Sequence, residues 1–221
     1  MSEKPLSNTE RTKPGRMRDR AVTDRAAMYE VLDSNILCHL GLIFDGQPFV
    51  LPYGYARDGD RILLHGSSGA RFMRALADGA PVCVTVTELT GMVVARSTFN
   101  SSMNYRSVVV LGCATEVTGD EKARLLEVIS DGFLPGRSAE VRASTKKEIA
   151  ATTLLSISLE EASLKVRAHG VEDEDEDLNT GVWAGVVPIK LVAGEPEPDG
   201  EEAAGLPVPA SVLAYVANPK G

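Results

Sequence analysis

Apolar positions along the chain follow two periods, first helical and then alternating. Residues 23–35, TDRAAMYEVLDSN, carry apolar side chains at the spacing of one helical face. Thr23 is suited to cap the start of such a helix, and Asn35 is suited to end it. From there the apolar runs become short and rich in β-branched residues, which is typical of strands. The pattern therefore predicts one helix followed by a region of sheet.

Turn signals divide this β-rich region into a series of strands. The runs NILCHLGLIF and QPFVLPYGYA meet at Asp45-Gly46, a dipeptide that favours a tight hairpin. A second turn at residues 57–60 leads into RILLHG, which predicts a three-stranded meander. We expect another pair of strands in PVCVTVTEL and GMVVARSTF, a further strand in NYRSVVVLGCATEVTG, and one or two in TTLLSISLEEASLKVRAHG.

Helical spacing returns in two segments between these strands, SSGARFMRALADG and GDEKARLLEVISDGF. Short turns join most of the strands, so neighbouring strands are expected to pair antiparallel. The sum is an α+β protein of six to seven strands, in which an antiparallel sheet closes into a small barrel with peripheral helices.

Composition sets the boundaries of this barrel. Residues 1–21 are polar and basic, which predicts an N-terminal arm, and residues 22–170 carry the barrel pattern. Residues 171–192 combine an acidic loop with a short apolar segment that is expected to dock on the barrel. Residues 193–221, rich in Gly, Pro and Glu at their start, are expected to form a flexible tail.

Charge and cysteine content narrow the function classes. The formal net charge of −8 argues against general binding of nucleic acids, which draws on neutralised phosphates. No apolar run reaches the roughly 18 residues that a membrane span needs, and the N-terminus lacks a secretory signal, so we expect a cytoplasmic protein. Cys38, Cys83 and Cys113 lie among apolar neighbours and are expected to be reduced packing residues, with no metal site.

Two polar stretches have the residue types of a binding site. In HGSSGAR, Gly66, Ser67 and Arg71 supply a close backbone approach, a hydroxyl donor and a guanidinium, which suit a phosphate, although such turns before helices are common. His65 stands beside this turn as either a half-buried histidine bonded to backbone or a group that contacts a ligand. In SSMNYRSVVVLG, the polar start is either ordinary strand-end decoration or a surface on which Tyr105 stacks against a flat ligand.

The motifs, in order, resemble the pyridoxamine 5'-phosphate oxidase-like superfamily of FMN-binding split barrels. The resemblance is carried by VLDSNILCHLGLIFDGQPFVLPYGYARDGDRILLHGSSGARF, PVCVTVTELTGMVVARS, SMNYRSVVVLG and VWAGVVPI, and it covers roughly residues 20 to 190. Its nearest branch is that of the nitroimidazole-resistance-type proteins. It implies a Greek-key split barrel that forms a homodimer, with FMN in each of two clefts between the subunits.

The resemblance also implies which residues surround the flavin. Those at the strand-to-helix turn, which would hold the phosphate, are His65, Gly66, Ser67 and Arg71. Those along the flavin ring are Leu51, Pro52 and Tyr53. Those contributed by the second subunit are Asn104, Tyr105, Arg106 and Ser107, and Trp183 resembles a C-terminal aromatic near the site. His65 is the candidate for proton delivery.

Oxidases of pyridoxamine phosphate proper carry basic residues at four positions where this chain has Pro48, Tyr53, Ala70 and Arg71, three of them uncharged, which argues against vitamin B6 oxidase activity. The leading hypothesis is an FMN-dependent oxidoreductase that takes electrons from a reduced nicotinamide and passes them to a small acceptor such as a nitroaromatic. The alternatives are a haem-binding split barrel with His65 or His39 as iron ligand, a barrel that binds flavin without catalysis, and a deazaflavin reductase.

Overall fold

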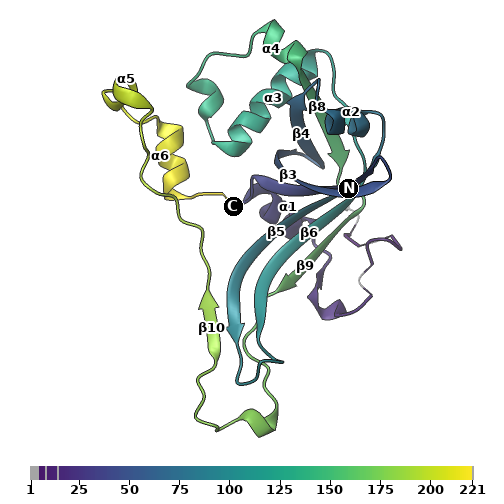
Figure 1. Cartoon of the computed structure of the whole chain (residues 1–221), viewed down its shortest axis with the longest axis vertical. Coiled ribbons are helices and arrows are strands. Elements are labelled where there is room, and N and C mark those ends of the chain that lie inside the picture. The colour runs from purple at the N-terminus through teal and green to yellow at the C-terminus, as the bar shows by residue number, and fades with distance from the viewer. Residues whose placement is uncertain (1–4, 8, 14, 221) are drawn as a thin grey trace.

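The computed structural model describes residues 5–7, 9–13 and 15–220. Its strands form one antiparallel sheet that curls into a split barrel, in the order β1-β9-β6-β5-β2-β3-β4-β8-β7, with β10 paired to β5 (Figure 1). The strands are β1 (Ala21–Val22), β2 (Leu37–Phe44), β3 (Gln47–Asp58), β4 (Arg61–Ser67), β5 (Pro81–Val94), β6 (Ser102–Cys113), β7 (Thr115–Glu116), β8 (Thr152–Ser158), β9 (Ala162–Arg167) and β10 (Gly185–Pro188).

The α+β architecture is as predicted, but the predicted count of six to seven strands is too low, because the described residues form ten. Seven of them are six or more residues long, and the additional ones are short pairings of two to four residues. The expected pair PVCVTVTEL and GMVVARSTF is also wrong, since the first run and the start of the second, residues 91–94, form the single strand β5. Gly91 lies at a register shift of the β5–β6 pairing, and a Cβ there would lie 3.2 Å from Val187 O, so this glycine accommodates β10 and makes no turn.

The helices and turns of helix are η1 (Arg18–Arg20), α1 (Arg25–Asp33), α2 (Arg71–Ala77), α3 (Asp120–Phe133), η2 (Arg137–Ala139), α4 (Lys146–Ala151), η3 (Asp175–Asp177), α5 (Gly200–Ala204) and α6 (Ala210–Ala217). Helix α1 begins one residue later than predicted, because Asp24 and not Thr23 is the cap: its Oδ1 accepts a hydrogen bond from Ala26 N at 3.1 Å. The predicted end holds, since Asn35 Nδ2 donates to Val31 O at 2.7 Å just after the helix. No helix among the described residues has the length and apolarity to cross a membrane.

Two apolar clusters lie on opposite faces of strand β4. Ile62 and Leu64 point into the barrel, where they join the buried face of α1 in the larger cluster. Leu63 points the other way and packs in a second cluster with Leu125 and Ile129 of α3. Figure 1 shows α3 and α4 as a layer beside β4 and β8, outside the barrel. The middle of β4 is therefore buried on both faces.

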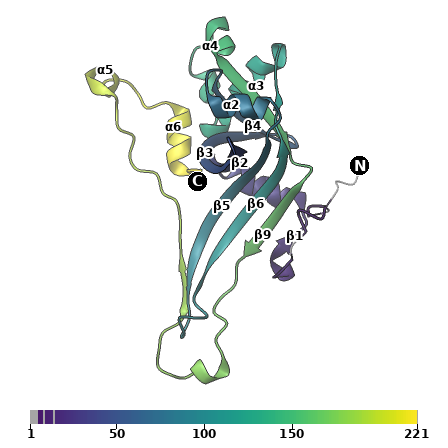
Figure 2. The ribbon, with the colours of Figure 1, turned by 45° about the vertical axis from the view of Figure 1, so that its right-hand side comes forward.

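The two terminal segments, expected to be an arm and a tail without regular structure, contain packed residues and helices. Part of the expected arm, residues 1–4, 8 and 14, lies outside the described residues. Leu6 is 2% exposed and belongs to the barrel cluster, so the described part of the arm packs against its own chain. The expected tail contains α5 and α6, which lie to one side of the barrel (Figure 2), with Ser211 N donating to Glu140 Oε1 at 2.9 Å. Its flexibility stays a prediction.

Candidate functional site

The corner between β4 and α2 is a closely packed turn. Ser67 Oγ accepts a hydrogen bond from Gly69 N at 3.2 Å, and Ser68 N donates to Ala151 O at 3.0 Å. A Cβ at Gly66 would lie 2.5 Å from Tyr53 Oη and 2.9 Å from Met73 Cγ, so a larger residue there would displace these side chains. Because the amides of residues 68–70 are used within the fold, an anion at this corner would depend on the exposed serine hydroxyls and on Arg71.

Arg71 provides a positive charge at this corner that nothing neutralises within the described part of the chain. Its guanidinium carbon lies 5.2 Å from the ring centroid of Phe44 and 5.8 Å from that of Phe72. The rings of Phe44, Phe49 and Phe72 pack against one another with centroids 4.9 to 6.2 Å apart. A cation held on aromatic faces keeps its N–H groups available, so Arg71 is suited to bind a phosphate.

His65 occupies the opposite face of β4, beside helix α3. Its ring centroid lies 6.1 Å from that of Phe133, and its Nδ1 is buried without a hydrogen-bond partner among the described residues. Burial lowers the pKa of His65, so the imidazole is neutral near pH 7. The interpretation as a histidine bonded to backbone therefore does not hold for Nδ1. A neutral ring with an unpartnered nitrogen can accept a proton or bind a metal.

A cavity of about 290 Å³ opens in front of His65. Leu126, Ile129 and Phe133 of α3 give it an apolar wall, and Glu148 of α4 lies at its rim. Sequence reasoning identified the apolar face of this helix but not its position beside His65. The helix is inserted between β7 and β8, and a periodic pattern alone does not tell which strand such an insertion covers.

The predicted residues of β3 lie on both faces of the strand. Pro52 is exposed on the outer face, opposite His39 of β2, whereas Leu51 and Tyr53 are half-buried. Tyr53 reaches the β4–α2 corner, because its hydroxyl lies beside Gly66. The structure thus brings Tyr53 together with the corner residues.

The remaining predicted residues lie elsewhere in the chain. Asn104 is 8% exposed, accepts from Arg167 Nη1 at 2.6 Å and donates to His169 O at 3.1 Å. Arg106 Nε donates to Glu88 Oε2 at 2.6 Å. Tyr105 and Ser107 are half-buried and alternate with these two along β6, and Trp183 is 65% exposed near the start of β10. Strands β5, β2 and β3 separate β6 from β4 in the sheet, so a contribution of these residues from a second subunit stays a prediction.

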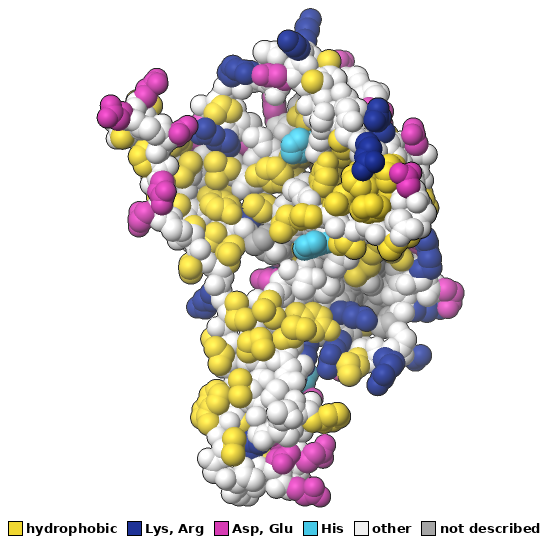
Figure 3. Space-filling view, viewed as in Figure 1, with side chains coloured by type: hydrophobic (Ala, Val, Ile, Leu, Met, Phe, Trp, Pro, Cys, Tyr) yellow, Lys and Arg dark blue, Asp and Glu magenta, His cyan; other side chains and the backbone are white. Residues whose placement is uncertain are grey.

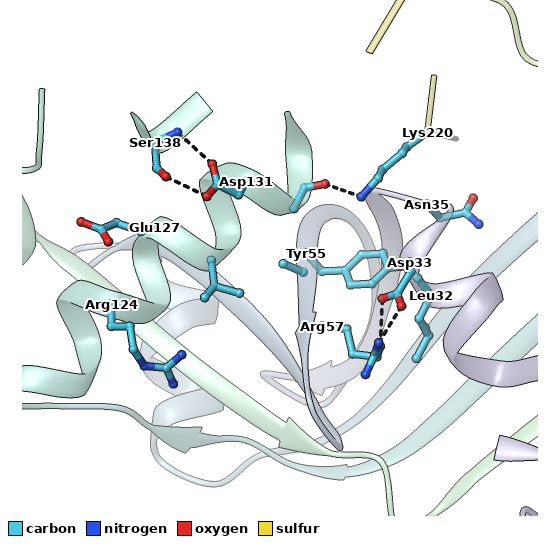
Figure 4. Close-up of a pocket in the computed structure, with 13 residues that line it drawn as sticks. Leu32, Asp33, Asn35, Tyr55, Arg57, Arg124, Glu127, Asp131, Ser138 and Lys220 are labelled. Carbon is cyan, nitrogen blue, oxygen red and sulfur yellow. Dashed lines mark hydrogen bonds and ion pairs between the residues drawn. The ribbon is translucent and has the colours of Figure 1, made fainter. Parts of the chain in front are cut away.

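A further cavity, of about 420 Å³, lies between the end of α1, strand β3 and helix α3 (Figure 4). Its polar groups are largely bonded to one another. Arg57 Nη2 donates to Asp33 Oδ2 at 2.6 Å, and Asp131 accepts from Ser138 Oγ at 2.7 Å. Lys220 Nζ donates to the backbone of α3 at 3.0 Å. Unlike the cavity at His65, this one offers few unpaired groups to a ligand.

Comparison with known proteins agrees with this architecture. A family model described as pyridoxamine 5'-phosphate oxidase matches residues 24–166. The chain belongs to this family. No curated protein sequence matches the chain. The predicted split-barrel family is confirmed.

Two solved structures are similar to this chain over nearly their whole length. The FAD and haem binding protein from Mycobacterium smegmatis is 43% identical, with a TM-score of 0.87, over 89% of this chain and 97% of its own. The flavocytochrome Anf3 from Azotobacter vinelandii is 38% identical, with a TM-score of 0.88, over 95% of this chain and 98% of its own. A candidate 5-nitroimidazole antibiotic resistance protein from Bacteroides thetaiotaomicron is 17% identical, over 66% of this chain and 86% of its own, with a TM-score of 0.57, and shares the fold alone.

Proposed function

We propose that this protein is a flavocytochrome, which binds a flavin and haem and passes electrons between them. Two relatives that are 43% and 38% identical over almost their full length carry descriptions of this kind, which supports the proposal. The single observation in the chain itself that carries it is His65, a neutral imidazole whose buried Nδ1 has no partner among the described residues and which lines a cavity with one apolar wall.

His65 is the residue that we propose to hold the haem iron. A metal needs the neutral form of the ring, and burial already favours that form. Leu126, Ile129 and Phe133 suit the apolar face of a porphyrin and would exclude water from it. The cavity of about 290 Å³ is at the small end for a ligand site, so the macrocycle would extend past its rim towards solvent or a second copy. The same lowered pKa makes His65 a poor proton donor at pH 7, which argues against the predicted role in proton delivery.

Arg71 and the exposed hydroxyls of Ser67 and Ser68 are the residues that we propose to bind a flavin phosphate. The sequence led us to expect FMN. The relative from Mycobacterium smegmatis, which is 43% identical, is described as binding FAD, so we propose FAD for this chain. When bound, a flavin supplies the conversion between two-electron donors, such as a reduced nicotinamide, and the one-electron chemistry of haem. Arg71 would neutralise the phosphate and fix the position of the cofactor at the β4–α2 corner.

We also propose a homodimer. The outer face of β2 and β3 exposes Leu37, Ile43 and Val50, at 47%, 64% and 68%. Large apolar side chains exposed along one sheet face are typical of a surface that a second chain covers.

The test is the visible spectrum of the purified protein, with mass spectrometry of the released cofactors. We expect a Soret band together with flavin absorption. His65→Ala should lose the Soret band and keep the flavin, whereas His39→Ala, a histidine on the exposed outer face of β2, should keep both. A protein that binds neither cofactor when both are added would refute the proposal. An unchanged Soret band in His65→Ala would refute the assignment of the ligand.

The nitroaromatic acceptor stays a prediction. The similarity to the resistance-type protein, at 17% identity, supports the fold and not the substrate. Turnover of a nitroimidazole with a reduced nicotinamide by the flavin-loaded protein would support it, and oxidation of the nicotinamide without loss of the nitro group would contradict it.

A further inference from the structure

The N-terminal arm and the outer face of β6 and β9 line two adjoining open cavities of about 290 and about 330 Å³. Tyr105 and Lys165 line both of them. Arg16 and Arg20 complete the first cavity, which lies under the turn η1. We call these two cavities the arm pocket. The arm that covers them is held in place by pairing of Ala21 with Lys165.

Three of the five cations that line the arm pocket lack counter-ions within the described part of the chain. Arg11 and Lys13 form ion pairs with Glu161 and Glu10, but the structure gives no carboxylate partner to Arg16, Arg20 or Lys165. Arg20 Nε is buried without any hydrogen-bond partner among the described residues. In Figure 3, dark blue side chains gather over the region where Figure 1 shows the N-terminal arm.

A buried arginine next to the arm pocket adds to this positive potential. Arg167 pairs with Tyr105 in the β6–β9 register and is only 4% exposed. Its Nη1 donates to Asn104 Oδ1 at 2.6 Å, a neutral acceptor, and no carboxylate of the described residues pairs with it. Burying an unneutralised guanidinium is unfavourable unless an anion compensates it. In a chain with a net charge of −8, such a cluster of unpaired cations indicates a binding site for an anion.

The arm pocket also has the features that recognise a nucleotide. Tyr105 offers an aromatic face on which a base can stack, and Ser107 and Ser163 offer hydroxyl groups. A single inorganic phosphate would fill little of two cavities of this size. We propose that the arm pocket binds the adenosine diphosphate moiety of a dinucleotide, the half that FAD and the reduced nicotinamide dinucleotides share. The link to a cofactor or donor rests on the proposed function, whereas the nucleotide site itself does not.

The test is calorimetric titration of the purified protein with ADP. Loss of one charge-assisted contact should weaken ADP binding about tenfold or more in Arg20→Ala and in Lys165→Ala. Arg18→Ala is the matched control, because Arg18 is an exposed cation of the same arm that does not line the pocket. We expect its affinity to stay within about twofold of the original. Circular dichroism and a thermal melt establish that each variant folds.

Competition identifies the source of the nucleotide. If FAD displaces ADP, and Arg20→Ala weakens FAD about tenfold while FMN binding is unchanged, the arm pocket holds the adenosine half of the flavin. If ADP still binds to the flavin-loaded protein and Arg20→Ala raises the KM for the reduced nicotinamide, the pocket serves the electron donor. Either result supports the nucleotide site. If the protein binds ADP but neither haem nor flavin, the nucleotide site is supported and the proposed function is refuted.

Three results would overturn the inference. They are no binding of ADP to the cofactor-free or the loaded protein, inorganic phosphate binding as tightly as ADP, and equal losses in Arg18→Ala and Arg20→Ala. If any of these occurs while the Soret and flavin bands are present, the inference fails and the proposed function stands.

Discussion

The contact between helix α3 and strand β3 offers a test of how closely the layer beside His65 is packed. A Cβ added at Gly132 of α3 would lie 2.7 Å from Ala56 Cβ. Favourable carbon–carbon contacts lie at about 3.5–4.0 Å, so the helix would have to move by about 1 Å. Ala56 has no side-chain rotation that relieves the contact, and therefore the backbone itself must shift.

We expect Gly132→Ala to destabilise the protein by about 1–2 kcal/mol. Overpacking of this kind costs about 1–3 kcal/mol, and replacing a glycine inside a helix returns about 0.5–1 kcal/mol. The measurement is urea unfolding followed by far-ultraviolet circular dichroism, because Trp183 is 65% exposed and is a poor reporter of the core. For a chain of 221 residues this loss corresponds to a fall in Tm of roughly 2–8 °C.

The matched control is the double variant Gly132→Ala with Ala56→Gly, in which the new methyl group takes the space of the old one. A favourable coupling energy of about 1 kcal/mol or more between the two substitutions is expected. The helix shift should also move Phe133 relative to His65, so in a protein that binds haem as proposed the Soret maximum should change in Gly132→Ala and return in the double variant. A single variant as stable as the original, with no coupling, would refute the close packing of α3 on β3.

Three further predictions concern single side chains. Tyr55 Oη donates to a buried carbonyl at 2.7 Å, so Tyr55→Phe should lower the free energy of unfolding by about 1–2 kcal/mol, and no change in urea midpoint would contradict this. Burial raises the pKa of Cys38 to about 12, so a thiol reagent at pH 8 should label the exposed Cys113 and reach Cys38 only on unfolding; equal labelling of the folded protein would contradict it. The Arg142 guanidinium lowers the pKa of Glu148 from 4.5 to about 2, so its stabilisation is present above pH 4.5 and is lost as the pH falls towards 2. The Tm difference between the protein and Glu148→Gln should therefore narrow over that range, and a constant difference would contradict it.

Much of the fold could be predicted from the sequence, because its signals are local. The Asp45-Gly46 hairpin is found at the junction of β2 and β3, with both residues at positive φ. The alternation in RILLHG correctly puts His65 on the face of Leu63. Gly91, in contrast, reads as the start of a new strand in the sequence, and only the approach of β10 shows why a glycine interrupts β5. The short strands could not be predicted, since pairings of two residues depend on tertiary contacts and not on pattern.

The candidate site was only partly predictable for the same reason. The residues at the β4–α2 corner are close in sequence, and their grouping followed from it. The walls of the cavity at His65 come from α3, more than 60 residues further along the chain, and nothing in the spacing of its apolar residues identifies the strand that it covers. The unpaired charges of the arm pocket could not be recognised either. A sequence shows which residues are charged but not which cations form ion pairs with a carboxylate.

Strand alternation separates the four residues predicted to reach a flavin from a second subunit. Asn104 and Arg106 share the face of the buried Val108, and both are occupied within their own chain, by Arg167 and by Glu88. Tyr105 and Ser107 lie on the outer face, where they line the arm pocket. A ligand on that face would meet the tyrosine ring and the serine hydroxyl directly. Asn104 would act on it only through the buried guanidinium of Arg167, so the polar residues at the start of β6 divide into a contact pair and a supporting pair.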